Sequence, residues 1–313
     1  YQAGPYDPLS LTVLPWECPS SPATFHYEKG GSLFCSTQTD CLLCIDEPTG
    51  NLAWAIDGIG GKIAWEDGMI VAGPDAQGFI HALTGQPAIL WRHPGDLLET
   101  SDSSAYIAGA DTITSVLLKT GQFQAENTSG SDITSLMYDP CLGILLAGTE
   151  AGLIHVFDQD LGFVDLFTVN TPETILDIHT FDLNKTLYTI AFTRERAVCM
   201  TFDGPVWTYG FTGGTYLNAA VMDSRLYLTI WKGDQDCEGI DTGRSTLTVL
   251  NGLSGEKISE YVLLSGKAFG PLIELEEKMI EYTSWDMTTV PVDISALKGI
   301  GRVHLGSKRT DRR

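Results

Sequence analysis

A short phrase centred on a glycine recurs along the chain, and no other feature constrains the fold as strongly. The glycines stand at positions 50, 85, 121, 162, 204, 255 and 299, in the phrases EPTGNLAW, ALTGQPAILW, LKTGQFQA, QDLGFVDLF, FDGPVWTY, GLSGEKISEY and ALKGIGRVHL. Successive glycines lie 35, 36, 41, 42, 51 and 44 residues apart. A repeat of this length is one supersecondary unit, which buries its apolar faces only against neighbouring units. The chain is therefore predicted to be an array of about seven similar units.

Each unit has the pattern of four short strands. The fourth unit shows this best, as DITSLMYD, ILLAGTE, LIHVFD and VDLFTV, with turn residues in the breaks. These segments are rich in β-branched and aromatic residues and are too short for helices. We therefore predict an all-β fold, a seven-bladed β-propeller of four-stranded antiparallel blades. It would span residues 20–306, between an N-terminal segment 1–19, in which residues 10–16 could add a ring-closing strand, and a basic tail 307–313.

Two stretches, GMIVAGPDAQGFIHALTGQPAILW and ILLAGTEAGLIHVFDQDLG, resemble the repeats of quinoprotein-like (PQQ-like) propellers, which are related to WD40 blades. The resemblance covers nearly the whole chain from about residue 20 and implies a propeller. It implies no single activity, because the superfamily contains dehydrogenases, assembly scaffolds, sensor domains and biosynthetic enzymes. Its quinone-dependent dehydrogenases are usually longer and eight-bladed, and several carry a disulfide between adjacent cysteines. This chain is shorter and has no adjacent cysteines, which argues against bound PQQ.

The chain is strongly acidic, and this narrows its partners. The 40 Asp and Glu residues against 19 Lys and Arg residues give a net charge of −21. Such a field repels phosphate backbones and anionic lipid surfaces, so nucleic acid and membranes are not expected as partners. No apolar stretch approaches the roughly 18 residues that span a bilayer, which predicts a soluble chain. The basic tail is interpreted as a solvated terminus.

The cysteines favour a reducing compartment. There are 7, an odd number, and most lie inside apolar runs such as LFCS, CLLC and AVCM. Reduced buried thiols behave as small hydrophobic residues in such runs, so the cytoplasm is favoured over secretion. Cys41 and Cys44 have the spacing of redox and zinc motifs. On a predicted strand, however, residues three apart face opposite sides, and we assign this pair no chemistry.

Several large side chains are predicted to pack rather than to bind. The aromatic residues that follow the glycine should pack between neighbouring blades; these are Trp54, Trp91, Phe123, Phe163 and Trp207. His81 and His155 occupy equivalent third-strand positions and should also be packing residues.

The working face of a propeller is formed by two kinds of loop, those joining a blade's second strand to its third and those joining one blade to the next. Arg194 and Arg196 form a compact cationic feature in one such loop. They could clamp a carboxylate or enolate through bidentate hydrogen bonds, or form ion pairs with neighbouring loops. Other candidate ligand-binding residues are predicted at the channel mouth, in loops of both kinds or, for the histidine, on an innermost strand; these are His26, Lys62, Tyr216, Lys267 and Trp285.

A histidine on a predicted innermost strand is the candidate general base. Asp177 and His179 alternate, which points both side chains the same way. A carboxylate-oriented imidazole facing the channel could take up a proton. The alternative is a structural histidine with its hydrogen bonds satisfied.

The segment GDQDCEGIDTGRS at residues 233–245 lengthens the sixth unit and is predicted to be a loop on the working face. Asp234, Asp236, Glu238 and Asp241 alternate like the oxygen ligands of a Ca²⁺ loop. Ser245 stands where an EF-hand would have its bidentate glutamate, and no helices flank the segment. It is either a Ca²⁺ loop or a solvated acidic flap, and no other cofactor is expected.

Three functions remain open from the sequence. The first is a binding or scaffold propeller that presents its acidic top face and channel mouth to a protein, a peptide or a small ligand. The second is a cofactor-independent enzyme, such as a cyclase, isomerase or lyase. It would use Asp177, His179, Arg194 and Arg196 as acid, base and anion clamp. The third, least favoured, is a quinone-dependent dehydrogenase. The sequence favours binding, since it contains no G-x-S-x-G, P-loop or dinucleotide motif.

Overall fold

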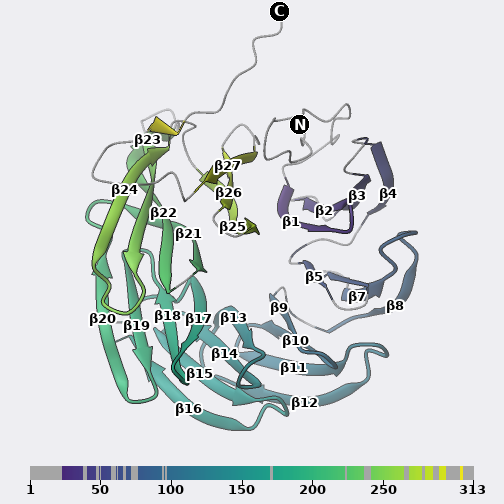
Figure 1. The fold of residues 1–313 in the computed structure, drawn as a ribbon. Helices are drawn as coiled ribbons and strands as arrows, with labels where there is room; N and C mark the ends of the chain where they lie inside the picture. Colours follow the sequence, from purple (N-terminus) through teal and green to yellow (C-terminus); the bar gives the residue numbers. More distant parts are fainter. Residues whose placement is uncertain are drawn as a thin grey trace, which may run out of the picture. The chain divides into compact units, whose positions relative to one another are not determined.

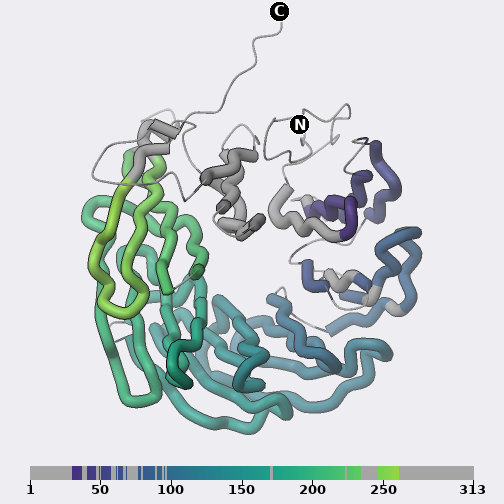
Figure 2. Tube along the Cα trace, in the orientation of Figure 1, coloured from purple at the N-terminus to yellow at the C-terminus, as the bar shows by residue number. Residues whose placement is uncertain are grey.

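Every regular element that the structure describes is a β-strand. The computed structural model describes residues 23–305, with gaps at 38–40, 47–48, 50, 58–60, 62, 66–67, 72–76, 94, 96, 170–171, 223, 236–240, 264–267, 277–278, 285–288 and 294–303. Figures 1 and 2 show the strands and the course of the chain. The chain divides into two compact units, which consist mainly of Leu14–Ile178 and His179–Arg313.

The first unit contains four sheets, each an antiparallel array of four strands in sequence order. The first sheet consists of β1 (Ala23–Lys29), β2 (Ser32–Thr37), β3 (Cys41–Asp46) and β4 (Asn51–Asp57). The second consists of β5 (Ile63–Trp65), β6 (Met69–Val71), β7 (Gln77–Ile80) and β8 (Pro87–Trp91). The third consists of β9 (Leu97–Thr100), β10 (Ser104–Gly109), β11 (Thr112–Leu117) and β12 (Phe123–Thr128). The fourth consists of β13 (Ile133–Asp139), β14 (Ile144–Thr149), β15 (Leu153–Asp158) and β16 (Phe163–Thr168).

The second unit contains three described sheets, and the unit boundary falls within the first strand of the fifth sheet. That sheet consists of β17 (Asp177–Leu183), β18 (Thr186–Phe192), β19 (Arg196–Thr201) and β20 (Gly204–Gly210). The sixth consists of β21 (Thr215–Met222), β22 (Arg225–Gln235), β23 (Asp241–Asn251), β24 (Lys257–Leu263) and β28 (His304–Leu305). The seventh consists of β25 (Ala268–Glu276), β26 (Met279–Ser284) and β27 (Thr289–Asp293).

The predicted all-β fold built from four-stranded antiparallel blades is confirmed. Seven sheets are described, of which five have four strands, one has five and one has three. This number agrees with the seven units predicted from the glycine phrase, and closure of seven blades into one ring stays a prediction. In the sixth sheet β28 pairs in parallel with β24, with His304 opposite Val262. The predicted ring-closing strand at 10–16 and the basic tail 307–313 lie outside the described residues.

Apolar side chains between neighbouring sheets form the core. Tyr106, Leu145 and Phe157 of the third and fourth sheets are fully buried, and Tyr106 stacks on Tyr138 with ring centroids 5.6 Å apart. Burying a side chain of this size stabilises a fold by roughly 1.5–3 kcal/mol. In the second unit, burial raises the pKa of the Cys199 thiol to about 12, so this cysteine is an apolar packing residue.

The recurrent glycine packs against a tryptophan of the preceding sheet. Trp54 on β4 donates a hydrogen bond from Nε1 to the carbonyl oxygen of Ala82 at 2.8 Å. Gly85, in the turn before β8, has φ +64°, and a Cβ built there would lie 2.5 Å from Cδ2 of Trp54. Glycine adopts this conformation without strain and leaves room for the indole ring. We call this arrangement the glycine–tryptophan contact.

The glycine–tryptophan contact recurs in the second unit. Trp207 on β20 donates a hydrogen bond to the carbonyl oxygen of Gly252 at 2.8 Å, and a Cβ on Gly255 would lie 2.7 Å from the Trp207 ring. Trp91 on β8 lies against Gly121 in the same manner, 3.0 Å from a Cβ built there. The predicted packing of these three tryptophans between neighbouring blades is confirmed.

The prediction that Phe123 and Phe163 pack in the same way is wrong. Their side chains are 54% and 59% exposed. In the strand register, Trp54 stands opposite Cys44, directly before a β-bulge, whereas Phe123 stands opposite Val116, directly after one. Because successive residues of a strand point to opposite faces, positions on either side of the bulge face different neighbours.

Smaller or polar residues occupy the tryptophan position in the third and fourth sheets. Ala125 stands opposite Ser115, and Asp165 stands opposite Val156, each directly before the bulge. Ala125 lies four residues after Gly121, as Trp54 does after Gly50, and Asp165 lies three residues after Gly162, as Trp207 does after Gly204. The two phenylalanines stand closer to the glycine, on the other side of the bulge.

The two third-strand histidines differ in their surroundings. His155 on β15 is half-buried and stacks on Phe157 with ring centroids 6.1 Å apart, which confirms its predicted packing role. His81 lies directly after β7 and is exposed, so the packing prediction for this residue is wrong.

Candidate functional site

The two kinds of loop that were predicted to share a face do meet in the first unit. The turn between β10 and β11 accepts two backbone hydrogen bonds from the connection between the third and fourth sheets. Ser129 N–H donates to Asp111 O at 2.8 Å, and Ile133 N–H donates to Ala110 O at 2.7 Å. The turn and the connection are therefore held together by the backbone.

The same pattern in the second unit places the predicted arginines. Phe211 N–H donates to Glu195 O at 2.7 Å, and Tyr216 N–H donates to Arg194 O at 3.1 Å. Arg194 and Glu195 thus occupy the positions of Ala110 and Asp111 in the repeat. The backbone that carries them is a standard part of the fold, and only the side chains are particular to this sheet.

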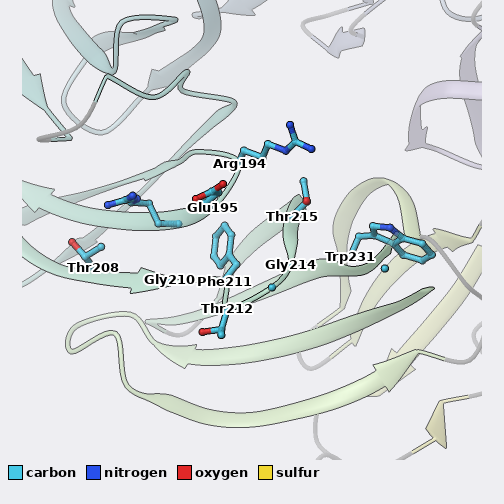
Figure 3. A pocket seen from close by; sticks show the side chains of 12 residues that line it. Arg194, Glu195, Thr208, Gly210, Phe211, Thr212, Gly214, Thr215 and Trp231 are labelled. Carbon is cyan, nitrogen blue, oxygen red and sulfur yellow. The ribbon is translucent and has the colours of Figure 1, made fainter. Parts of the chain in front are cut away.

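A hollow of about 680 Å³ opens between this turn and the connection from β20 to β21. Twelve residues line it, all within the second unit, and Figure 3 shows their side chains. Arg194, Glu195 and Arg196 come from the turn and the start of β19, and Phe211–Gly214 come from the connection. Its volume is that of a typical site for a small ligand or a short stretch of peptide.

Arg194 is the most available cation of the hollow. Its side chain is exposed, and it forms no ion pair or hydrogen bond with any side chain in the described part of the protein. In Figure 3 it extends away from Glu195. The alternative that Arg194 is held by ion pairs with neighbouring loops therefore finds no support among the described residues. Arg196 is half-buried and also lines the hollow.

The connection supplies hydrogen-bond donors. Gly213 has φ +67° in a turn closed by a hydrogen bond from Gly214 N–H to Phe211 O at 2.7 Å. Within the described residues, the N–H groups of Thr212 and Gly213 donate to no protein acceptor, and neither does the Thr212 hydroxyl. The hydroxyls of Thr208 and Thr215, which also line the hollow, make no such bond either. These donors are available to a ligand.

A third cation close to the hollow is already paired. A Cβ built on Gly214 would lie 3.1 Å from Cγ of Lys232, yet Lys232 Nζ contacts Glu260 Oε1 at 2.8 Å. Lys257 Nζ contacts the other oxygen of Glu260 at 2.7 Å. Hydrogen bonds from Lys232 and Lys257 lower the pKa of Glu260, which therefore stays ionised and balances Lys232.

Tyr216 lies beneath the hollow and does not line it. It is the second residue of β21, is only 7% exposed, and stacks on Phe192 with ring centroids 4.7 Å apart. It also stacks on Phe211 at 6.3 Å. The structure therefore places Tyr216 in the core and not in the sheet-to-sheet loop where the sequence predicted a ligand contact.

Asp177 and His179 share β17, as predicted, but neither lines the hollow. His179 is half-buried and meets Phe192 edge to face with ring centroids 5.6 Å apart. Asp177 Oδ1 accepts a hydrogen bond from the N–H of Ile178 at 2.8 Å. The structure thus brings together the two arginines of the predicted catalytic set, and Asp177 and His179 do not join them in the lining.

The other predicted ligand-binding residues are not placed at the hollow. His26 lies on β1 opposite Cys35. Lys62, Lys267 and Trp285 lie outside the described residues.

The predicted loop at 233–245 is largely strand. β22 and β23 pair as far as Gln235 opposite Asp241, so the backbones of Asp234 and Asp241 belong to the ladder. Asp236 and Glu238 lie in 236–240, outside the described residues, and Ca²⁺ binding there stays a prediction. No group of three or more His, Cys, Asp or Glu side chains in the described ranges is placed to hold a metal ion. Nor do those ranges contain a helix that could cross a membrane.

Sequence reasoning missed the connection itself and Trp231. Gly210–Thr215 reads GFTGGT, and all six residues line the hollow. The signal available in the sequence was the glycine pair Gly213–Gly214. The structure shows why Gly214 is needed, because a Cβ there would lie 2.5 Å from Cγ2 of Ile230. Trp231 follows Ile230 in an apolar strand, and its sequence context is that of a core residue.

No protein-family model matches the sequence, and no curated protein is similar to it in sequence. Several solved structures are similar in fold. The C-terminal WD40 domain of Sif2 has a TM-score of 0.70 at 12% identity, covering 91% of this chain and 86% of that chain. BamB from Moraxella catarrhalis has a TM-score of 0.67 at 14% identity, covering 91% of this chain and 89% of that chain. The β-propeller domain of Cps50 (Swd1) from Myceliophteria thermophila has a TM-score of 0.63 at 10% identity, covering 87% of this chain and 96% of that chain. These likenesses show the fold, a β-propeller.

Proposed function

We propose that this β-propeller is a binding protein that takes up a peptide segment of a protein partner at the hollow beside Arg194. The observation that carries the proposal is the hollow itself, about 680 Å³ in volume. Among the described residues, its Arg194 forms no ion pair, and its backbone and hydroxyl donors bond to no protein acceptor. A peptide backbone offers a carbonyl acceptor at every residue, so these donors match it chemically. The fold supports the proposal, since propellers present loops on a rigid frame of sheets.

The lining of the hollow favours binding over catalysis. Its ionisable side chains are Arg194, Glu195 and Arg196. A cyclase, isomerase or lyase needs a proton donor and acceptor close to the substrate. The predicted acid–base pair, Asp177 and His179, does not line the hollow, and Glu195 is the single carboxylate among the described lining residues. Two arginines and one carboxylate are better suited to binding a ligand than to acid–base catalysis.

Selection from an unbiased peptide-display library tests the proposal. The enriched peptides are synthesised and their affinities for the wild type and for Thr212→Trp are compared by fluorescence anisotropy. Thr212 is exposed in the connection, so an indole there fills the hollow without disturbing the core. We expect binding to weaken by about tenfold or more, equivalent to about 1.4 kcal/mol.

The control is Thr128→Trp. Thr128 is an exposed threonine that ends β12, beside another sheet-to-sheet connection, and it does not line the hollow. This substitution should leave affinity unchanged. The proposal fails if no peptide is enriched, or if the enriched peptides bind Thr212→Trp as tightly as the wild type.

A further inference from the structure

We infer that the hollow recognises carboxylate side chains, so that the segment it binds is an acidic stretch of a partner protein. This inference rests on the proposed function and names the chemistry of its ligand. Nothing in the inference requires a metal, a cofactor or a reaction.

The first argument is the imbalance between donors and acceptors. Arg194 and Arg196 carry guanidinium groups, which only donate hydrogen bonds. The N–H groups of Thr212 and Gly213 and the Thr212 hydroxyl donate to no acceptor among the described residues. Within the described part of the lining, Glu195 is the single ionisable side chain that accepts hydrogen bonds. A ligand rich in acceptors, such as a carboxylate, complements this surface.

The second argument is the local charge. Among the lining residues that the structure describes, Arg194 and Arg196 against Glu195 give a formal net charge of +1, in a chain whose net charge is −21. Lys232 does not add to this balance, because Glu260 holds it. Arg194 forms no ion pair among the described residues, so its charge is available to an incoming ligand. A guanidinium and a carboxylate can form two parallel hydrogen bonds, which are among the strongest polar contacts in proteins.

The third argument is selectivity. The acidic surface elsewhere repels anions at long range, and this repulsion grows with the ligand's charge. A polyphosphate or nucleic acid is therefore repelled more strongly than a short peptide with a few carboxylates. A ligand that sets an anionic group directly on Arg194 offsets the repulsion. An acidic peptide meets both conditions.

Two matched peptides test the inference directly. One is a fluorescein-labelled peptide of alternating glycine and glutamate, and the other has glutamine at every glutamate. We expect the glutamate peptide to bind at least about tenfold more tightly. In ¹H–¹⁵N spectra it should shift the amide signals of Thr212 and Gly213 and the Nε–H signal of Arg194. Equal affinity of the two peptides would overturn the inference.

Substitutions locate the contact. Arg194→Gln should reduce affinity for the glutamate peptide about tenfold. The affinity of Arg194→Lys should lie between those of the wild type and Arg194→Gln, since lysine keeps the charge but loses the bidentate geometry. Arg225→Gln is the matched control, because Arg225 is an exposed arginine of the same unit that does not line the hollow. Arg194 contributes its carbonyl to the fold through Tyr216 N–H, so its side chain can change without loss of that bond. Unaltered binding in Arg194→Gln would contradict the assignment.

The outcome separates this inference from the proposed function. If library-selected peptides lose affinity for Thr212→Trp but contain no acidic residues, peptide binding at the hollow stands and carboxylate recognition falls. If a phosphoserine peptide binds and the glutamate peptide does not, the ligand is a phosphate and the inference is likewise wrong. If Thr212→Trp affects no peptide, both are wrong.

Discussion

At the scale of the residue, Gly85 shows why the recurrent phrase needs glycine. Its φ of +64° disfavours any other side chain, and the Trp54 ring fills the space that a Cβ would occupy. The two demands are independent, because one concerns the backbone of the turn and the other concerns the neighbouring sheet. A substitution must therefore meet both demands.

Replacing Gly85 with alanine should be strongly destabilising. We expect the free energy of unfolding to fall by about 2–4 kcal/mol, the sum of a left-handed alanine and an overpacked contact. Gly130→Ala provides the control, since Gly130 has φ +71° but nothing within 4 Å of a Cβ. It should cost only about 1 kcal/mol. Denaturant unfolding followed by circular dichroism measures both, and equal losses would mean that the Trp54 contact contributes nothing.

Residue-level reasoning from the sequence found part of the candidate site. Arg194 and Arg196 could be predicted, because a compact basic pair is unusual in so acidic a chain. Their loop could also be placed on the working face, because the repeat defines which turns lie there. The donors of Thr212 and Gly213 could not be predicted, since whether a backbone N–H is used depends on the turn that the chain adopts.

At the scale of the element, the pair β15 and β16 holds a half-buried histidine. His155 stands opposite Ala147 on β14 and Leu166 on β16, and its ring contacts Phe157 and Phe163. Its Nε2 is buried without a hydrogen-bond partner in the described part of the chain. Burial lowers the pKa of His155, because the charged imidazolium would lose its hydration there.

The fourth sheet should therefore make the protein sensitive to acid. With the folded-state pKa depressed, protons bind the unfolded chain more readily, and stability is lost as pH falls below about 6.5. The denaturation midpoint of the wild type should drop more between neutral and mildly acidic pH than that of His155→Phe, which keeps a ring in the stack. His81→Phe, at an exposed position, should retain the wild-type pH dependence. A His155→Phe protein with the same dependence would contradict the expectation.

Strand ends could be predicted where turn residues mark them. They could not be predicted where pairing with a neighbouring strand extends a strand through residues that usually form loops. The strands of the fourth sheet follow their turns closely. Gly233, Asp234 and Gln235 are typical of a loop, yet β22 continues through them because β23 pairs with the whole stretch. A partner strand supplies backbone hydrogen bonds, and the β-propensities of the single residues do not include this contribution.

At the scale of the whole molecule, the repeat predicted the fold because its period is a property of the entire chain. The period does not mark the bulge in each last strand, and Phe123 and Phe163 lie on the other side of it from Ala125 and Asp165, which occupy the tryptophan position. Function is still less visible, since the same sheets can carry many kinds of site.

The net charge of −21 should make stability depend on salt. Mutual repulsion of carboxylates opposes the compact state, and dissolved ions screen it over about 10 Å at 0.1 M. We expect the melting temperature to rise by a few degrees when NaCl is increased from about 20 to about 300 mM. KCl at the same ionic strength should give the same rise. A fall with both salts would show that specific ion pairs outweigh the general repulsion.

The glycine–tryptophan contact also bears on how such a chain can lengthen during evolution. The tryptophan comes from the last strand of one sheet and the glycine from a turn in the next. The second sheet has both halves, Gly85 and Trp91, so a duplicate of it would carry one half of each junction. Such a duplicate could be inserted next to its parent sheet without new complementary surfaces having to arise first.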